Sequence, residues 1–119
     1  MSGYESLKVY QRSYKAAKAM RKITREMPET ERYALIDQMN RASLSIPLNI
    51  AEGYAKKESQ AEFRRYLLMA IGSANEMSVL VDFAKDLEYI GKDRHEKAKK
   101  EYEEISKMLR ALIEKTKQK

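Results

Sequence analysis

Two carboxylates are the only side chains in this 119-residue sequence with both a chemistry and a setting that could support catalysis. Glu52 and Glu76 lie in segments that are otherwise mostly small or apolar. A carboxylate that becomes buried can have a raised pKa and act as a general acid. More often such a group accepts backbone hydrogen bonds or caps a helix bend. We therefore favour a structural role for both residues.

No motif for a metal or a nucleophile is recognisable. The chain has no Cys and one His, His95, and the residue three before it is Lys92, so the Glu-x-x-His pairs of di-iron bundles are missing. His95 is expected in the first turn of the last helix, facing solvent. Gly91-Lys92 lacks the upstream glycine of a phosphate-binding loop. The sequence predicts a protein that is not an enzyme, with no cofactor, no metal and no small-molecule substrate.

The apolar residues recur at steps of three and four, which is the period of packed helices. With 43% apolar residues, 35% charged residues and few Gly or Pro, we predict an all-α fold. Four helices are expected at about 6–26, 30–53, 60–89 and from 93 onward, joined by short connections. The sequence therefore predicts one domain over residues 1–119, an antiparallel up-down-up-down four-helix bundle.

Helix ends are expected at residues with capping chemistry. Ser6, Ser59 and Asp93 are predicted N-caps, the last two followed at the third position by Glu. Gly91 is predicted to end the third helix, because glycine adopts the left-handed conformation at low cost.

The second helix contains a proline within its apolar pattern. Pro47 cannot donate a hydrogen bond to the carbonyl of Ser43, at a cost of about 3 kcal/mol or more. We predict a kink at Pro47, with Ser43 and Ser45 satisfying the freed backbone groups and with Asn49 and Glu52 as polar side chains on the turn just beyond.

Two glycines are expected to have structural roles. Gly53 is predicted to end the kinked helix as a left-handed cap. Gly72, in the middle of the third helix, costs about 1 kcal/mol relative to Ala and is expected to let another helix approach closely. Glu76, one turn further, could meet Asn49 or Arg41.

Together these segments resemble the 23S rRNA intervening-sequence proteins. The resemblance covers nearly the whole chain and is carried by residues of the second and third helices: Gln38, Arg41-Ala42, Ser45-Ile46, Asn49-Ile50-Ala51-Glu52-Gly53 and Gly72-Ser73-x-x-Glu76. It implies a four-helix bundle that forms a homo-oligomer, a pentamer, without established enzymatic activity. Some similar proteins are accessory proteins of diversity-generating retroelements.

Charge is distributed unevenly along the chain. The net charge is +6, made up of +5 over residues 1–26, −3 over 27–91 and +4 over 92–119. On the first helix the cations lie opposite the apolar stripes, at Lys8, Arg12, Lys15, Lys18, Lys22 and Arg25. Such a face either binds a polyanion or is simply solvated. The tyrosines at 10, 14, 66 and 102 fall on the apolar stripes, so a stacking platform for bases is not expected.

These patterns favour a non-enzymatic homo-oligomer that engages RNA or a ribonucleoprotein through basic helix faces. The alternative is a structural scaffold or protein-binding adaptor, such as an accessory subunit of a retroelement reverse transcriptase. No signal peptide is recognisable, and no stretch approaches the ~20 apolar residues of a membrane span. The sequence thus predicts a cytoplasmic protein with no membrane partner.

Overall fold

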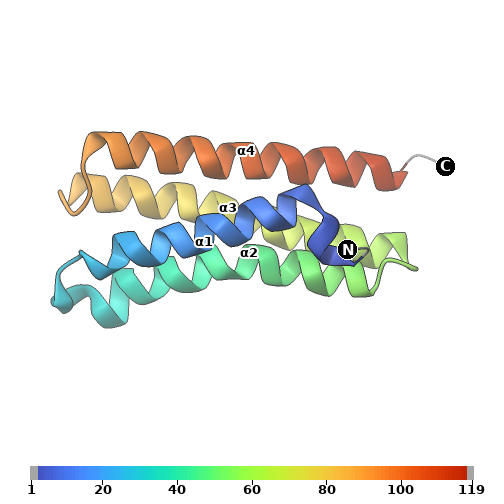
Figure 1. Ribbon diagram of the computed structural model, residues 1–119, viewed down its shortest axis with the longest axis horizontal. Helices are drawn as coiled ribbons and strands as arrows, with labels where there is room; N and C mark the ends of the chain where they lie inside the picture. The colour runs from blue at the N-terminus through green and yellow to red at the C-terminus, as the bar shows by residue number, and fades with distance from the viewer. Residues whose placement is uncertain (1–2, 118–119) are drawn as a thin grey trace.

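The computed structural model describes residues 3–117, which form four long helices (Figure 1). They are α1 (Lys8–Arg25), α2 (Asp37–Ala55), α3 (Gln60–Asp86) and α4 (Lys92–Lys117). Successive helices run in opposite directions, and the bundle measures 48 × 23 × 22 Å. The predicted all-α, up-down-up-down bundle is confirmed.

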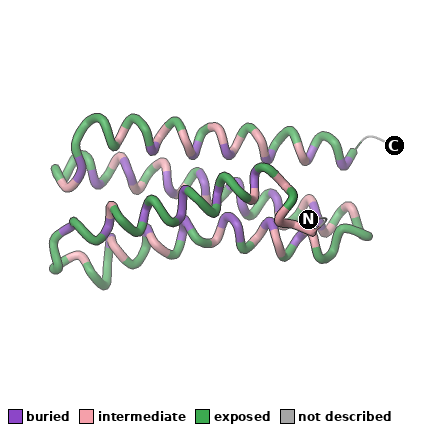
Figure 2. Tube along the Cα trace, in the orientation of Figure 1, coloured by how far each residue is buried: buried purple, intermediate pink, exposed green. Residues whose placement is uncertain are grey.

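One face of each helix is buried along the axis of the bundle (Figure 2). The third helix shows the predicted apolar period, with buried residues at steps of three and four: Phe63, Leu67, Ala70, Ala74, Met77, Val81 and Ala84. A fully buried aliphatic side chain stabilises the fold by about 1.5–3 kcal/mol. This shared core holds the helices in register and fixes which of their faces meet solvent.

One predicted N-cap is confirmed and two are wrong. Ser59 accepts a hydrogen bond from the Glu62 N–H at 3.2 Å, as expected. The Ser6 hydroxyl instead donates to the Gly3 carbonyl in a 3₁₀ turn, and α1 begins only at Lys8. α4 begins at Lys92, so Asp93 lies inside its first turn, where the helix dipole still favours an acid.

The turn between α3 and α4 does not use its glycine as predicted. α3 ends at Asp86, and the residue with a positive φ is Glu88, at 65°. Gly91 has no positive φ, and its carbonyl accepts the His95 N–H at 3.0 Å. Gly91 therefore stands at the start of α4 and does not end α3.

The segment before α2 is wound differently from the predicted start of the second helix near residue 30. A 3₁₀ turn spans Glu29–Glu31 and a π-helical turn spans Arg32–Ile36. A wider turn of this kind inserts a residue into the helical pattern. The α-helix proper begins at Asp37.

α2 runs as one α-helix through Pro47, which is buried, and a kink there is not confirmed. Ser43 and Ser45 donate to the carbonyls of Asn40 and Ala42, three residues earlier in each case. The Asn49 amide donates to the Ser45 carbonyl at 2.9 Å. These three bonds go to carbonyls other than that of Ser43, so they do not compensate the group that Pro47 frees.

Both glycine predictions need correction. α2 continues to Ala55, so Gly53 lies inside the helix, is buried and has no positive φ. Gly72 is exposed, and a Cβ added there would meet nothing within 4 Å. Within a single chain Gly53 is the glycine at a close helix–helix contact, and Gly72 is free of one.

α3 ends three residues before the predicted boundary at residue 89, but it is more apolar than expected. It has 27 residues, and its most apolar 18-residue window has a mean hydropathy of 1.3 with 39% of that window buried, so by length and composition alone it could cross a membrane. The prediction that no stretch is apolar enough to span a membrane failed because it counted uninterrupted apolar residues. In α3, small polar residues separate the apolar ones. The core helix of a soluble protein passes the same test, so the property carries little weight by itself.

Candidate functional site

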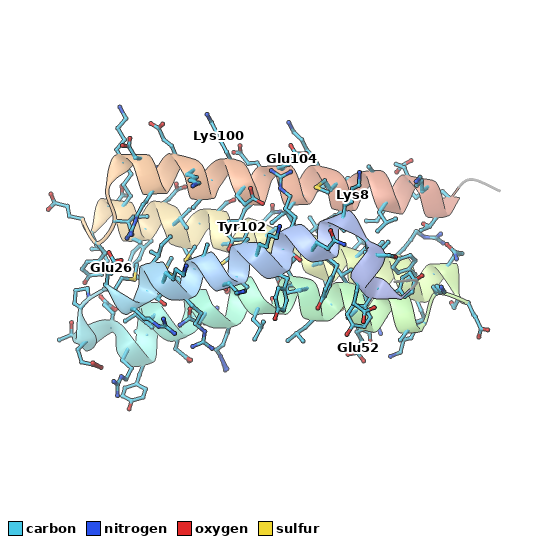
Figure 3. The ribbon with its side chains drawn as sticks, in the orientation of Figure 1. Lys8, Glu26, Glu52, Lys100, Tyr102 and Glu104 are labelled. Atoms are coloured by element: carbon cyan, nitrogen blue, oxygen red, sulfur yellow. The ribbon has the colours of Figure 1, made fainter. Side chains whose placement is uncertain are left out.

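The helices do not surround the core evenly, and an open groove lies between α1 and α4. α1 packs mainly on α2 and only weakly on α4. The groove has a volume of about 850 Å³ and is lined from both helices. Figure 3 shows Tyr102 between α4 and α1, whereas Lys100 points away from the bundle.

The cations predicted on α1 are placed along this groove. Five of the six line it, Arg25 being the exception: Lys8, Arg12, Lys15, Lys18 and Lys22. α4 adds Arg94 and Lys97 from the opposite side, and Glu101 is the one carboxylate among the described lining residues. The groove is therefore basic along both rims.

Two ion pairs join the rims. Arg12 donates to both carboxylate oxygens of Glu101, at 2.7 and 3.2 Å, and this hydrogen bonding raises the pKa of Arg12. Arg94 donates to Glu26 at 2.8 and 3.2 Å and lowers the pKa of that carboxylate. Both pairs are largely exposed, so each contributes little to stability.

Most of the remaining rim cations are not neutralised. Within residues 3–117, no ion pair involves Lys8, Lys15, Lys22 or Lys97. Lys18 lies 5.9 Å from the ring centroid of Tyr14, a weak cation–π contact. The groove thus has an excess of positive charge available to an external anion.

The groove floor is apolar, with one exception. It is formed by aliphatic residues and one ring: Ala16, Ala19, Met20, Ile23, Ala98 and Tyr102. The Tyr102 side chain is buried, which raises the pKa of its phenol, and its hydroxyl has no hydrogen-bond partner among residues 3–117. A buried donor without a partner is uncommon and costs about 1–3 kcal/mol.

The placement of the tyrosines was only partly predicted. Tyr102 is in the core, and Tyr10 and Tyr66 are half-buried. The prediction that Tyr14 is a core residue is wrong. Its side chain is 48% exposed and lies beside Lys18, because this side of α1 faces away from α2 and α4. Tyr14 beside Lys18 and Tyr33 beside Arg32 are exposed rings on separate segments, and they do not form a ladder of stacking platforms.

A basic face was expected on the last helix as well as the first, but none of the α4 residues in the groove was predicted. Arg94, Lys97 and Glu101 follow steps of three and four, beside the buried Ala98 and Tyr102. This spacing puts them on the flank of the core stripe, and it was the available signal. The mixed Lys and Glu composition of α4 concealed it.

The two candidate carboxylates are not brought together. Glu52 points away from the bundle in Figure 3 and pairs with Lys56 at 3.3 Å. Glu76 accepts a hydrogen bond from Gln38 and not from Asn49 or Arg41. Arg41 lies 3.6 Å from Asp37, one turn away on the exposed face of α2. Glu52 was also expected to accept backbone hydrogen bonds, and its bond to Lys56 corrects that prediction.

A small polar contact joins α2 to α3. The Ser45 hydroxyl lies 2.6 Å from the Ser73 hydroxyl while also donating to the Ala42 carbonyl. Ser73 belongs to the Gly72-Ser73 motif, so this contact connects the two motif segments noticed in the sequence. Its role is in helix pairing.

His95 was expected to face solvent, and this is wrong. Its side chain is only 17% exposed, with Nε2 2.6 Å from an Asp82 carboxylate oxygen. Lys99 donates to the other oxygen at 2.9 Å, and His95 and Lys99 together lower the pKa of Asp82. α3 and α4 pack tightly enough to enclose the imidazole. Among the described residues, no group of three His, Asp or Glu side chains could hold a metal ion.

The outer faces of α2 and α3 expose large apolar side chains. Leu68, Val79 and Phe83, with Gly72 between them, follow helical steps of four and seven on α3. Leu44 and Leu48 are exposed one turn apart on the neighbouring α2. Contiguous exposed apolar surface often marks a contact with another protein surface.

These features define an all-helical bundle protein with a basic, apolar-floored groove on one side and an apolar helix pair exposed elsewhere. The chain belongs to the 23S rRNA-intervening sequence protein family, whose model matches residues 5–111.

A solved structure supports the assignment. The chain is similar to a protein with unknown function from the S23 ribosomal protein family of Bacteroides thetaiotaomicron VPI-5482, with 25% identity and a TM-score of 0.81. The similarity covers 89% of this chain and 95% of that one. No curated protein matches the chain. The family and the fold are thereby shown.

Proposed function

We propose that this protein is a non-enzymatic homo-oligomer that engages RNA or a ribonucleoprotein through the basic faces of α1 and α4. The observation that carries the proposal is the convergence of seven cations from two helices on one groove, five of them without an ion pair among residues 3–117. A surface of this kind attracts a phosphate backbone and releases counterions when it binds.

Recognition in this proposal depends on charge and shape. No exposed aromatic ladder is present among residues 3–117, and the rim is mostly lysine, which acts as a flexible point charge. We therefore expect weak sequence preference and a steep decrease of affinity with salt.

Self-association is proposed to use the exposed apolar face of α2 and α3. Leu48, Val79 and Phe83 would be covered by a second copy, and Gly72 would allow its helix to approach closely. A closed ring is the expected form, with five subunits as the sequence resemblance implies. Repetition around a ring would multiply the basic grooves.

The structure changes how the basic face should be tested. Replacing Arg12 by Glu would place a second carboxylate beside Glu101, so its effects on folding and on binding would be mixed. Lys15 and Lys22 have no ion pair and are exposed. The double variant Lys15→Glu/Lys22→Glu is therefore the sharper test, with Lys57→Glu/Lys85→Glu as a control of equal charge change.

Binding should be measured by fluorescence anisotropy with labelled single-stranded RNA over a range of salt concentrations. Each lost phosphate contact reduces the slope of log affinity against log salt by about 0.7, so two lost contacts reduce it by about 1.4. The control variant should retain the wild-type slope. Equal loss in both variants, or no binding by the wild type at low salt, would show that the rims are only a solvated surface.

The alternative function, a protein-binding adaptor, is favoured by a different observation. A phosphate backbone would contact the lysine rims but would leave the aliphatic floor of the groove uncovered. An apolar floor matches a protein ligand better than a nucleic acid.

A further inference from the structure

We propose that the groove between α1 and α4 is a docking site for an acidic amphipathic helix of a partner protein. The inference goes beyond RNA binding, because it gives the groove a second ligand of a different class that would compete for the same lysines. The proposal is based on the spacing of the rim charges, the small size of the floor residues and the apolar character of the floor.

Three lysines on the α1 rim repeat every seven residues, which is the repeat of helices packed as a coiled coil. Lys8, Lys15 and Lys22 are seven residues apart, or two helical turns, and all line the groove. At 1.5 Å per residue they span about 21 Å along α1. A helix lying alongside would meet all three lysines if it carried an acid every seven residues, as in the flanking positions of coiled coils.

The floor allows a helix to come close. Ala16 and Ala19 lie one turn apart on α1, and Ala98 faces them from α4. Small residues at these positions permit an interaxial distance near the lower end of the usual 8–10 Å. Ile23, which is half-buried, adds branched apolar surface for the apolar side of the ligand. An amphipathic helix in a groove is a recurring mode of peptide recognition.

The polar contacts already present show the chemistry. Glu101 reaches from α4 to Arg12 on α1, and Glu26 reaches in the opposite direction to Arg94. Cations on the rims thus bind carboxylates across the groove. Lys15, Lys22 and Lys97 have no carboxylate partner among residues 3–117. A ligand rich in carboxylates complements this pattern better than an aliphatic anion with a single charge.

The test uses a synthetic amphipathic peptide of about 18 residues with Glu at three positions seven apart and Leu and Ala on the adjoining face. A second peptide has the same composition with its glutamates distributed around the helix. Both are labelled, and binding to the full-length protein is measured by fluorescence anisotropy. We expect the patterned peptide to bind at least about tenfold more tightly than the redistributed one.

Two matched variants locate the site. Ala19 is exposed on the groove floor, so Ala19→Arg should fill the groove without disturbing the core. Ala111→Arg adds the same charge at an exposed position of α4 that does not line the groove. We expect Ala19→Arg to weaken peptide binding at least about tenfold although it adds a positive charge, and Ala111→Arg to leave it within about twofold. Circular dichroism checks the fold, and Lys15→Glu/Lys22→Glu should also weaken binding if Ala19→Arg does not fold.

The outcomes separate this proposal from RNA binding. Ala19→Arg should retain or strengthen RNA binding while it blocks the peptide. The proposal is overturned if the wild type binds neither peptide, if it binds both equally, or if Ala19→Arg binds as tightly as the wild type. Displacement of the bound peptide by RNA would support the proposal, because both ligands would use the same lysines. Binding of laurate without binding of the peptide, or a self-association that Ala19→Arg abolishes, would assign the groove to another occupant and overturn it.

Discussion

Gly53 of α2 lies directly against Tyr66 of α3, so closely that a Cβ at Gly53 would be 2.7 Å from the Tyr66 Cβ. The same added atom would be 3.2 Å from a ring carbon of Phe63. The Tyr66 Cβ is fixed to the backbone, so it cannot move aside as the end of a long side chain would. This contact sets how closely the C-terminal half of α2 approaches α3.

We expect Gly53→Ala to destabilise the protein. Alanine gains about 1 kcal/mol of helix propensity, but the added methyl forces α2 and α3 apart at a cost of about 1–3 kcal/mol. Gly72→Ala is the matched control, since Gly72 is helical, exposed and free of neighbours. It should raise the free energy of unfolding of the single chain by up to about 1 kcal/mol. Urea unfolding of both variants would show opposite changes, and a stabilised Gly53→Ala would contradict the close contact.

These two glycines also show the limit of the sequence. A glycine within an apolar helical pattern is compatible with a helix end, a close contact or an exposed break. Periodicity could not distinguish them, because each depends on what lies opposite in space. The pattern correctly predicted the buried stripe of α3, from Phe63 to Ala84, since burial follows the helical period directly.

The groove was predictable only from one side. The cations of α1 stand out because few acids interrupt them, and five of these cations line the groove. Its existence depends on the weak packing of α1 against α4, which is a tertiary property. Likewise, the ion pair of Arg12 with Glu101 joins residues 89 positions apart, and no local pattern indicates it.

The unpartnered Tyr102 hydroxyl predicts a stabilising substitution. Tyr102→Phe removes a buried donor that has no partner and retains the ring, so the free energy of unfolding should rise by about 1 kcal/mol. Tyr89→Phe is the control, because the Tyr89 hydroxyl donates to Glu31 at 2.7 Å. Its removal should lower the free energy of unfolding by about 1 kcal/mol. If thermal unfolding shows both variants destabilised alike, the Tyr102 hydroxyl has a partner in solution.

The Asp82 cluster predicts a dependence of stability on acid. His95 and Lys99 lower the pKa of Asp82 in the folded protein below its unfolded value of about 3.9. The stabilisation is therefore complete above the unfolded pKa and is lost as the pH falls through the folded pKa. Because the Asp82 side chain is 48% exposed, we expect Asp82→Asn to cost about 1 kcal/mol or less at pH 7.

The measurement compares Asp82→Asn with Asp86→Asn, an exposed acid on α3 without an ion pair among the described residues. The difference in free energy of unfolding between wild type and Asp82→Asn should shrink as the pH decreases from 5 to 3. Asp86→Asn should differ little from wild type throughout. A difference for Asp82→Asn that is constant with pH would mean that the carboxylate charge is not what stabilises α3 against α4.

Self-association predicts that a charge on the exposed face of α3 separates the subunits without unfolding them. Val79 is 65% exposed, so Val79→Lys should change the stability of the isolated chain by only about 0.5 kcal/mol. If a second copy covers Val79, however, the lysine must lose its hydration or disrupt the contact. Light scattering at micromolar concentration should show an oligomer for the wild type and for Ala111→Lys, and a smaller species for Val79→Lys.

Gly72→Ala sharpens the test: a close approach at Gly72 requires that this variant weaken assembly even as it stabilises the helix. A wild-type monomer, or an assembly unaffected by Val79→Lys, would leave this apolar face without a role in self-association.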